Sequence, residues 1–249
     1  MHPAAGPART SPFYWNAEVR PGLRVGFTSA AAGNLALHVG ADPDRVRSNR
    51  LALESSMGVA AGSLRFMSQT HSDRVVLAGQ AGTQAPDADG MVSRDGTDAL
   101  AVLVADCVPI VLADASAADG GTGATAVVHA GRAGVVNGIV PGAVQVLREQ
   151  GARELSAWIG PSVCGSCYEV PEDMMRALAA EYPEAASRTR TGTPALDLPA
   201  AVRRQLEESG VTVEQVRGTL TACTLENDGL YSHRREPGAG RIAGLVWRT

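Results

Sequence analysis

Two histidines and one cysteine are the residues of this chain best placed to do chemistry together. His71 follows the dipeptide Gln-Thr, Cys107 lies in the run Ala-Asp-Cys-Val-Pro, and His129 precedes Ala-Gly. Each lies at the polar end of an apolar, strand-like run, and a sheet can bring such ends together at one edge. Two imidazoles and one thiolate suit zinc and leave a fourth position for water or substrate. Although each residue alone has an ordinary structural explanation, the set predicts a shared metal or catalytic site.

The composition excludes several classes of function. The chain has 249 residues, 45% of them hydrophobic, with a net charge of −4, which gives no basic surface for nucleic acid. It contains no lysine, so a Walker-type phosphate lysine or a Schiff-base lysine is excluded. Arginine remains available to bind phosphate. No apolar run reaches transmembrane length, and four cysteines without a secretion signal indicate a reducing compartment, so we expect a cytoplasmic protein.

The pattern of apolar runs predicts one mixed α/β domain. We expect residues 1–20 to form a flexible N-terminal tail, without the apolar segment of a signal peptide, and residues 21–249 to form a single catalytic domain. Strand-like runs and helical patterns are clustered and do not alternate regularly, which favours a mixed sheet. The expected strands span 23–28, 64–67, 74–77, 100–105, 108–113, 124–128, 155–159, 217–222 and 241–247. The expected helices begin at Pro43, after an Asp42 cap, and end near Gly58, and span 139–150, 171–181 and 198–209.

Two local features refine this prediction. The turn-rich run from Asp119 to Gly123 is typical of a hairpin between neighbouring strands. Pro109 places its strand at a sheet edge or in an irregular position, because proline lacks an N–H for the ladder.

A series of short motifs resembles one known family in composition and order. The motifs are Gln69-Thr70-His71, Ala105-Asp106-Cys107-Val108-Pro109-Ile110, His129-Ala130-Gly131, Ile159-Gly160-Pro161, Tyr168-Glu169-Val170, Cys223-Thr224, Tyr231-Ser232-His233-Arg234-Arg235-Glu236 and Gly240-Arg241. Together they resemble the YfiH family of purine nucleoside phosphorylases. Its members have also been labelled multicopper polyphenol oxidases, laccase-domain proteins and peptidoglycan editing factors. The resemblance runs from about Gly26 to the C-terminus.

This resemblance implies a fold, a metal and an activity. The family's metal ligands correspond to His71, Cys107 and His129 of this chain. The implied metal is zinc, with copper as an alternative. It implies phosphorolysis of adenosine, inosine, guanosine and methylthioadenosine, with deamination of adenosine as a side activity. The implied fold is a layered α/β sandwich similar to the catalytic domain of the cytotoxic necrotizing factors. The implied partners are a purine nucleoside and phosphate, with neither nucleic acid nor membrane, and the chain is expected to be a monomer or weak homodimer.

Two segments depart from the family pattern. Arg132-Ala133 stands where the family usually has Trp-Arg, and Ser29–Ala32 replaces its Arg-x-Gly-Gly segment. Both changes affect the expected contacts with substrate and phosphate more than the metal site.

The substrate contacts are predicted from charge and backbone chemistry. The glycine-bearing turn at 131–134, before a helix, offers backbone N–H groups to an anion, and Arg132, Arg234 and Arg235 are candidate phosphate contacts. The structural alternative is that these arginines are solvated or pair with nearby acids. Asn34 resembles the asparagine of the family's Ser-Leu-Asn-Leu segment, which implies a nucleoside contact, and the structural alternative is a loop cap. The candidates for a proton shuttle are Asp89, Asp106 and Glu169, and Asp106 can instead orient a metal-bound histidine.

Cys164 and Cys167 form a C-x-x-C motif outside these candidates. A thioredoxin-like redox site would need the motif at the start of a helix, whereas here the motif follows Gly-Pro and precedes Tyr-Glu-Val. A second zinc would need another pair of ligands, and no pair has the usual spacing. We therefore expect a local structural role for this motif and a buried position beside a strand for Cys223.

Three other functions stay open at this stage. Cys107 can act as a nucleophile with His71 or His129 as base, in a hydrolase or amidase that edits peptidoglycan precursors. A copper-loaded polyphenol oxidase is a second alternative, although five histidines without a His-x-His pair are few for a multicopper centre. A non-enzymatic binding module is the third, and it has no need of an open metal position.

Overall fold

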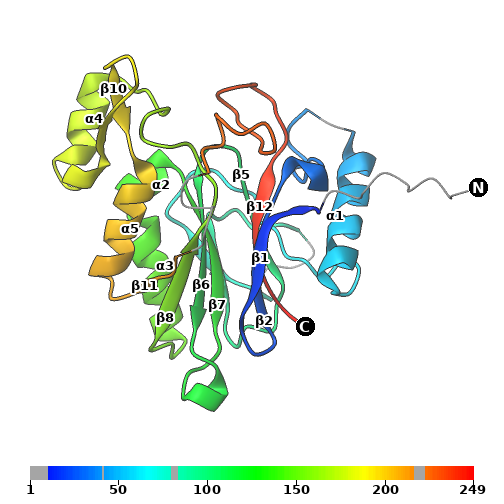
Figure 1. Ribbon diagram of the computed structural model, residues 1–249. Helices are drawn as coiled ribbons and strands as arrows, with labels where there is room; N and C mark the ends of the chain where they lie inside the picture. Colours follow the sequence, from blue (N-terminus) through cyan, green and yellow to red (C-terminus); the bar gives the residue numbers. More distant parts are fainter. Residues whose placement is uncertain (1–10, 41, 80–83, 216–221) are drawn as a thin grey trace, which may run out of the picture.

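Two β-sheets packed face to face form the middle of the molecule (Figure 1). They are seen in a computed structural model, which describes residues 11–40, 42–79, 84–215 and 222–249. One sheet contains, in order, β1 (Phe13–Arg20), β2 (Leu23–Thr28), β12 (Ile242–Arg248) and β5 (Leu100–Val104). The other contains β11 (Thr212–Val213), β8 (Leu155–Ile159), β6 (Val108–Asp114), β7 (Thr125–Ala130), β4 (Gly90–Ser93) and β3 (Val75–Leu77). A separate ribbon pairs β9 (Ala186–Arg188) with β10 (Pro194–Leu196).

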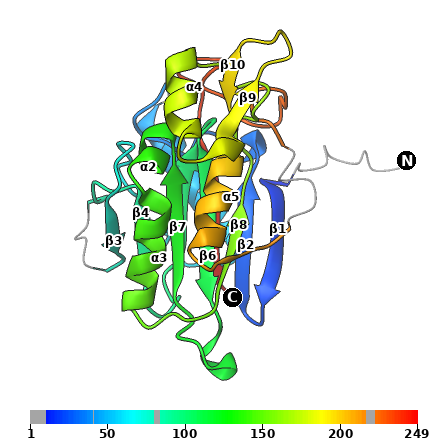
Figure 2. The same cartoon turned by 90° about the vertical axis from the view of Figure 1, so that its left-hand side faces the viewer.

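Helices cover the outer faces of both sheets. One group lies over the six-stranded sheet, as Figure 2 shows from that side. It contains α2 (Arg132–Val136), α3 (Ile139–Glu149), α4 (Glu172–Ala179) and α5 (Leu198–Glu208). On the other side α1 (Pro43–Met57) covers the four-stranded sheet. A short 3-10 turn at Ala30–Ala32 contacts α1, another at Ala117–Asp119 lies between β6 and β7, and a third at Pro183–Ala185 contacts α4 and α5. Throughout the described ranges, no helix has the length and apolar character needed to cross a membrane.

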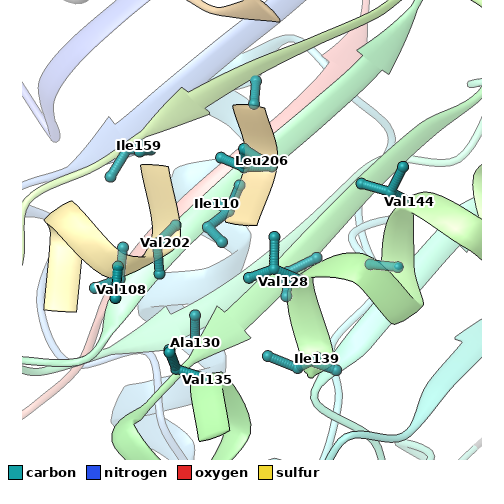
Figure 3. Packing of buried hydrophobic residues seen from close by; sticks show 14 of the residues in the cluster. Val108, Ile110, Val128, Ala130, Val135, Ile139, Val144, Ile159, Val202 and Leu206 are labelled. Atoms are coloured by element: carbon teal, nitrogen blue, oxygen red, sulfur yellow. The ribbon is translucent and has the colours of Figure 1, made fainter. Parts of the chain in front are cut away.

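The four layers follow from the two-residue period of the strands. On β6, Ile110 and Leu112 pack against the helices (Figure 3), whereas Val111 packs against the other sheet. On β12, Val246 points to the space between the sheets, while Trp247 packs under α1. Because successive side chains of a strand point to opposite faces, each buried strand serves two layers of core. The expected layered α/β class with a mixed sheet is confirmed: β3 runs parallel to β4 and β11 to β8, while the central pairs are antiparallel.

Most predicted elements form, with the caps that the sequence indicates. The Asp42 side chain accepts the backbone N–H of Asp44 at 3.0 Å, and Gly58 ends α1 with a left-handed φ of 75°. The hairpin between β6 and β7 contains the predicted turn at 119–123.

Three expectations need correction, and a fourth cannot be compared with the described residues. Residues 13–20, expected within a flexible tail, form β1, which pairs with β2 and is anchored by stacking of Phe13 on Trp247. Residues 64–67 contribute only an isolated bridge from Arg65 to Leu100. The strand expected at 217–222 lies almost wholly outside the described residues. Pro109 lies in a central strand, where it is tolerated because it is the second residue of β6, next to the strand end.

Candidate metal centre and its pocket

The structure brings His71, Cys107 and His129 together. One ligand atom from each lies within 4.8 Å of the others. The Cys107 Sγ is 3.6 Å from the Nε2 atom of His71, and the two imidazole rings meet edge to face with centroids 4.7 Å apart. These residues form a candidate metal-binding group, because their donor atoms need only small movements to bind one ion.

The strands position two of the three ligands directly. His129 lies in β7, opposite Pro109 of β6. Cys107 immediately precedes β6, in the tight turn from β5. Since β6 and β7 are antiparallel neighbours, the start of one strand and the end of the other lie at the same edge of the sheet. The turn before Cys107 requires a left-handed backbone at Asp106, with φ of 85°.

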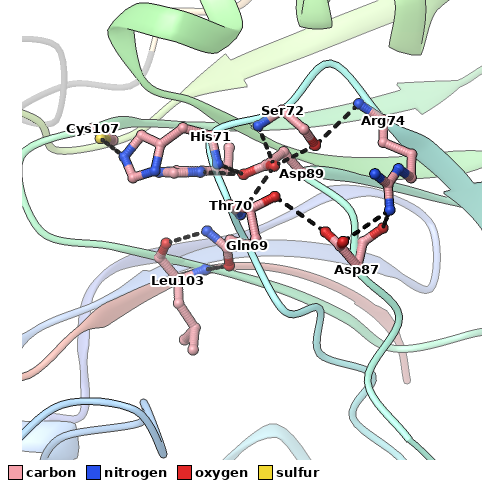
Figure 4. A network of polar contacts seen from close by, with 10 residues as sticks. Gln69, Thr70, His71, Ser72, Arg74, Asp87, Asp89, Leu103 and Cys107 are labelled. Carbon is pink, nitrogen blue, oxygen red and sulfur yellow. Dashed lines mark hydrogen bonds and ion pairs between the residues drawn. The ribbon is translucent and has the colours of Figure 1, made fainter.

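A buried carboxylate holds the third ligand in place. The His71 backbone has a φ of 63°, which is uncommon for a residue other than glycine. Asp89, which has no solvent exposure, accepts the backbone N–H groups of Thr70, His71 and Ser72 at 2.6–3.2 Å (Figure 4). The loop therefore wraps around a single side chain, which compensates for the unfavourable backbone conformation of His71.

Asp89 also orients His129. The Nδ1–H of His129 donates to Oδ1 of Asp89 at 2.7 Å, which leaves Nε2 as the ring atom available to a metal ion. Burial alone would raise the pKa of Asp89, but the hydrogen bonds from His129 and Ser72 outweigh burial and hold that pKa well below its usual range. Asp89, considered from sequence as a proton shuttle, therefore stays ionised and positions two of the ligands.

Cys107 and His129 stabilise each other's charged forms. Burial would raise the pKa of Cys107, but the field of His129 and hydrogen bonds from both histidines lower it to about 6. Burial would lower the pKa of His129, but the Cys107 thiolate and Asp89 raise it to about 9. Near neutral pH, the metal-free site therefore holds a thiolate beside an imidazolium.

A glycine allows the ligands to approach α2. Gly131 caps this helix, and a Cβ atom at that position would lie 2.5 Å from Cδ2 of His71 and 3.1 Å from the Cys107 sulfur. The His-Ala-Gly motif thus contains a ligand and a position that must lack a side chain.

The three ligands lie in a pocket of about 460 Å³ with several basic groups. Its lining consists of His38, Gln69, His71, Leu103, Val104, Ala105, Asp106, Cys107, His129, Tyr168, His233, Arg234 and Arg241. The side chain of Gln69 fixes one wall by pairing with the backbone of Leu103 through bonds of 2.7 and 2.8 Å. Two arginines in one pocket beside a candidate metal centre favour an anionic ligand.

Asp106 organises the wall that carries Arg234. Its carboxylate accepts the Thr224 hydroxyl at 2.6 Å and the backbone N–H of Arg234 at 2.8 Å. The Arg234 guanidinium lies 4.6 Å from the centre of the Tyr168 ring. Asp106 therefore shapes the pocket through its neighbours, which differs from the two roles considered from sequence, a proton shuttle and a support for a metal-bound histidine.

Some predicted substrate contacts lie elsewhere. Asn34 caps its own loop, donating to the carbonyls of Ala36 and Val39, and its Oδ1 accepts the backbone N–H of Arg241 at 3.0 Å. Its side chain thus makes the contacts of a loop cap, and it supports a residue that does line the pocket.

The other two arginines also have different surroundings. Arg235 donates to the carbonyls of Thr224, Leu225, Asn227 and Leu230, so it braces a loop. Arg132 lines a different pocket, between α2 and α4. Glu169 is exposed and pairs with Ala195 through a backbone bridge.

Sequence reasoning did not single out His38, Tyr168 or Arg241 as site residues. The motifs that carried the resemblance included Tyr168 and Arg241, which was the available signal. His38 lies outside those motifs, in the loop that precedes α1, and it lines the pocket.

The fold and the pocket define a four-layer α/β sandwich with a candidate metal centre that solvent can reach. The chain belongs to the family described as multi-copper polyphenol oxidoreductase laccase, whose model matches residues 24–249. A purine nucleoside phosphorylase of Mycobacterium bovis is 42% identical over 217 residues, covering 86% of this chain and 84% of that protein. Another, from Streptomyces coelicolor, is 41% identical over 239 residues, covering 91% and 96%.

Solved structures match the whole fold. The Neisseria meningitidis protein NMB0706, of the DUF152 family, has a TM-score of 0.79 and 29% identity, covering 96% of this chain and 99% of that chain. YlmD from Geobacillus stearothermophilus has a TM-score of 0.77 and 27% identity, with the same coverage. Together these matches confirm the resemblance to the YfiH family.

Proposed function

We propose that this chain is a zinc-dependent purine nucleoside phosphorylase acting on adenosine, inosine, guanosine and methylthioadenosine, with a side activity that deaminates adenosine. The observation that carries the proposal is the meeting of His71, Cys107 and His129 in a pocket that also contains two arginines. Relatives about 40% identical along most of their length carry the name purine nucleoside phosphorylase, which supports the same activity here.

The donor set fits zinc. Two imidazoles and one thiolate, with an accessible pocket on one side, leave one tetrahedral position for substrate or water. When bound, the ion supplies a Lewis acid in the pocket, which serves both the phosphorolytic and the deaminating reaction. Copper at the same ligands is the alternative that the family description suggests.

The pocket walls supply the remaining chemistry. Arg234 and Arg241 are placed to bind phosphate and offset its negative charge, while Leu103 and the ring of Tyr168 offer apolar surface to a purine. Burial, followed by the fields of Arg241 and Arg50, lowers the pKa of His38. A neutral imidazole accepts a hydrogen bond or a proton, so His38 is the pocket group that we assign to proton transfer.

The expected partners are therefore a nucleoside and phosphate. We propose no partnership with nucleic acid or membrane and expect a monomer or a weak homodimer. A cytoplasmic location suits the four cysteines, which are all free thiols.

A chromatographic assay with adenosine, in the presence and absence of phosphate, tests the proposal. Phosphate-dependent release of adenine and ribose 1-phosphate is the expected result, and inosine formed without phosphate would report the side activity. Unchanged adenosine, with zinc verified in the protein, contradicts the proposal.

One observation favours a second candidate, a cysteine hydrolase or amidase acting on peptidoglycan precursors. The Cys107 thiol has a pKa lowered to about 6 and lies 3.6 Å from His71, as a nucleophile would need. Chelation separates the candidates, because it abolishes zinc-dependent activity and leaves a thiol enzyme active. Iodoacetamide that inactivates the protein without releasing metal would favour the thiol enzyme.

A further inference from the structure

A second group of metal-ligating side chains lies outside the pocket. It consists of Cys164, Cys167, Cys223 and Glu226, which we call the cysteine cluster. One ligand atom from each lies within 4.8 Å of the others. Cys164 and Cys167 are half-buried, Cys223 is buried, and Glu226 lies at the surface.

Two tight turns, facing each other, build this cluster. In the first, the backbone N–H of Cys167 donates to the carbonyl of Cys164 at 3.0 Å; in the second, that of Glu226 donates to the carbonyl of Cys223 at 3.2 Å. Each turn thus presents two ligands three residues apart. This is the spacing with which paired ligands commonly bind one zinc ion.

Backbone contacts hold the two turns against each other. Ser162 and Cys223 form a parallel bridge, and the backbone N–H of Cys164 points to the Cys223 sulfur at 3.4 Å. Gly165, inside the first turn, is packed so closely that a Cβ atom would lie 2.8 Å from the Ser187 hydroxyl. The turns are therefore brought together by the fold, even though Cys164 and Cys223 are 59 residues apart.

We propose that the cysteine cluster binds a second zinc ion, with a structural role. Three thiolates and one carboxylate complete a tetrahedral set and leave no position for substrate. Zinc–sulfur bonds of about 2.3 Å place sulfur atoms about 3.8 Å apart, so the observed spacing needs only a small contraction. Arg190 already forms an ion pair with Glu226, and it offsets part of the negative charge of the ligands.

The position of the cluster gives the ion its role. Tyr168, which lines the catalytic pocket, follows Cys167 directly, and Thr224, which bonds to Asp106, follows Cys223. An ion that fixes both turns therefore fixes the wall that carries Tyr168 and Arg234. This proposal does not depend on the reaction catalysed in the pocket.

Metal analysis of the purified, reduced protein tests the proposal. The wild-type chain is expected to hold close to two zinc ions, and Cys107→Ala, which removes a ligand of the other site, close to one. The double variant Cys164→Ala with Cys167→Ala is also expected to hold one, whereas Ser166→Ala, between the two cysteines, is expected to hold two. With cobalt in place of zinc, Cys107→Ala should keep most of the thiolate-to-metal absorption, because three of the four thiolates remain.

The result that overturns the proposal is a Cys107→Ala protein that is folded and reduced but binds no ion. A disulfide between two of the three cysteines in freshly purified protein, with one zinc per wild-type chain, would overturn it as well. If the double variant fails to fold, the metal content and cobalt spectrum of Cys107→Ala still decide the question. Glu226→Gln is expected to lose its second ion to a chelator faster than the wild type, and an unchanged rate excludes Glu226 as the fourth ligand.

Discussion

The two candidate metal-binding groups of this molecule are built in different ways. His71, Cys107 and His129, which we call the open centre, come from three separate segments. This group depends on a buried carboxylate and two left-handed residues. The cysteine cluster comes from two short turns with regular spacing. An open centre for chemistry needs one position free and support from the protein around it, whereas a closed centre can be assembled from local turns.

This difference predicts that the two groups fail in different ways. Loss of a ligand in the pocket should remove activity and leave the fold intact, while loss of a ligand in the cysteine cluster should destabilise the pocket wall.

The largest effect is expected for Cys107→Ala. Removal of the only thiolate in the pocket should reduce phosphate-dependent adenine release to background, because the open centre loses its ion. The melting temperature should change little, which calorimetry can measure. A variant that retains wild-type turnover would show that Cys107 is not a ligand required for catalysis.

Gly131→Ala should nearly abolish zinc binding at the open centre, although it replaces none of the three ligands. The added methyl group would lie 2.5 Å from the His71 ring and displace it from Cys107. Gly142→Ala, in α3 with no atom within 4 Å of its added carbon, is the matched control. Zinc content and adenine release should fall in the first variant and remain in the second, and equal behaviour of the two would disprove the close-approach argument.

Asp89→Asn should weaken metal binding or activity by about 10–100-fold, the usual effect of removing a carboxylate behind a metal-bound histidine. The amide keeps one acceptor oxygen, but its NH2 group would face the N–H and O–H donors of Ser72 that now bind the carboxylate. Zinc affinity measured by competition with a chelator checks this prediction. An Asp87→Asn variant, with a surface carboxylate paired to Arg74, serves as control and should bind zinc normally.

Zinc affinity at the open centre should increase with pH. Binding requires a Cys107 thiolate and a neutral His129, whose pKa values in the metal-free site are about 6 and about 9. Between these values one proton must leave His129, so affinity should rise about tenfold per pH unit. Below pH 6 the dependence should be steeper, because Cys107 must lose a proton too. Zinc titrations of the double variant, which carries both Cys164→Ala and Cys167→Ala, measure this site alone. A zinc affinity that does not change with pH in that range contradicts the proposed ligand protonation.

The sequence predicted the open centre better than its surroundings. His71, Cys107 and His129 stood out because each follows or ends an apolar run, and the β6–β7 hairpin carries two of them to one edge. Arg132 and Arg235 have the right chemistry, but their neighbours in the fold direct them elsewhere. Whether a charged side chain enters a pocket depends on the packing of loops, which no local pattern records.

The same reason explains the missed partners of the C-x-x-C motif. Cys223 and Glu226 have the spacing of a ligand pair, contrary to the expectation that no second pair exists, but the sequence does not show that the fold brings this pair to Cys164. The strand β1 was missed because its pairing with β2, and the stacking of Phe13 on Trp247, stabilise a sequence with weak alternation.

Reconstitution of metal-free protein tests the central claim most directly. Protein stripped of both ions, with its fold verified, should show no phosphate-dependent release of adenine, and two equivalents of zinc should restore it in the wild type but not in Cys107→Ala. Full activity of the verified metal-free protein would contradict the account.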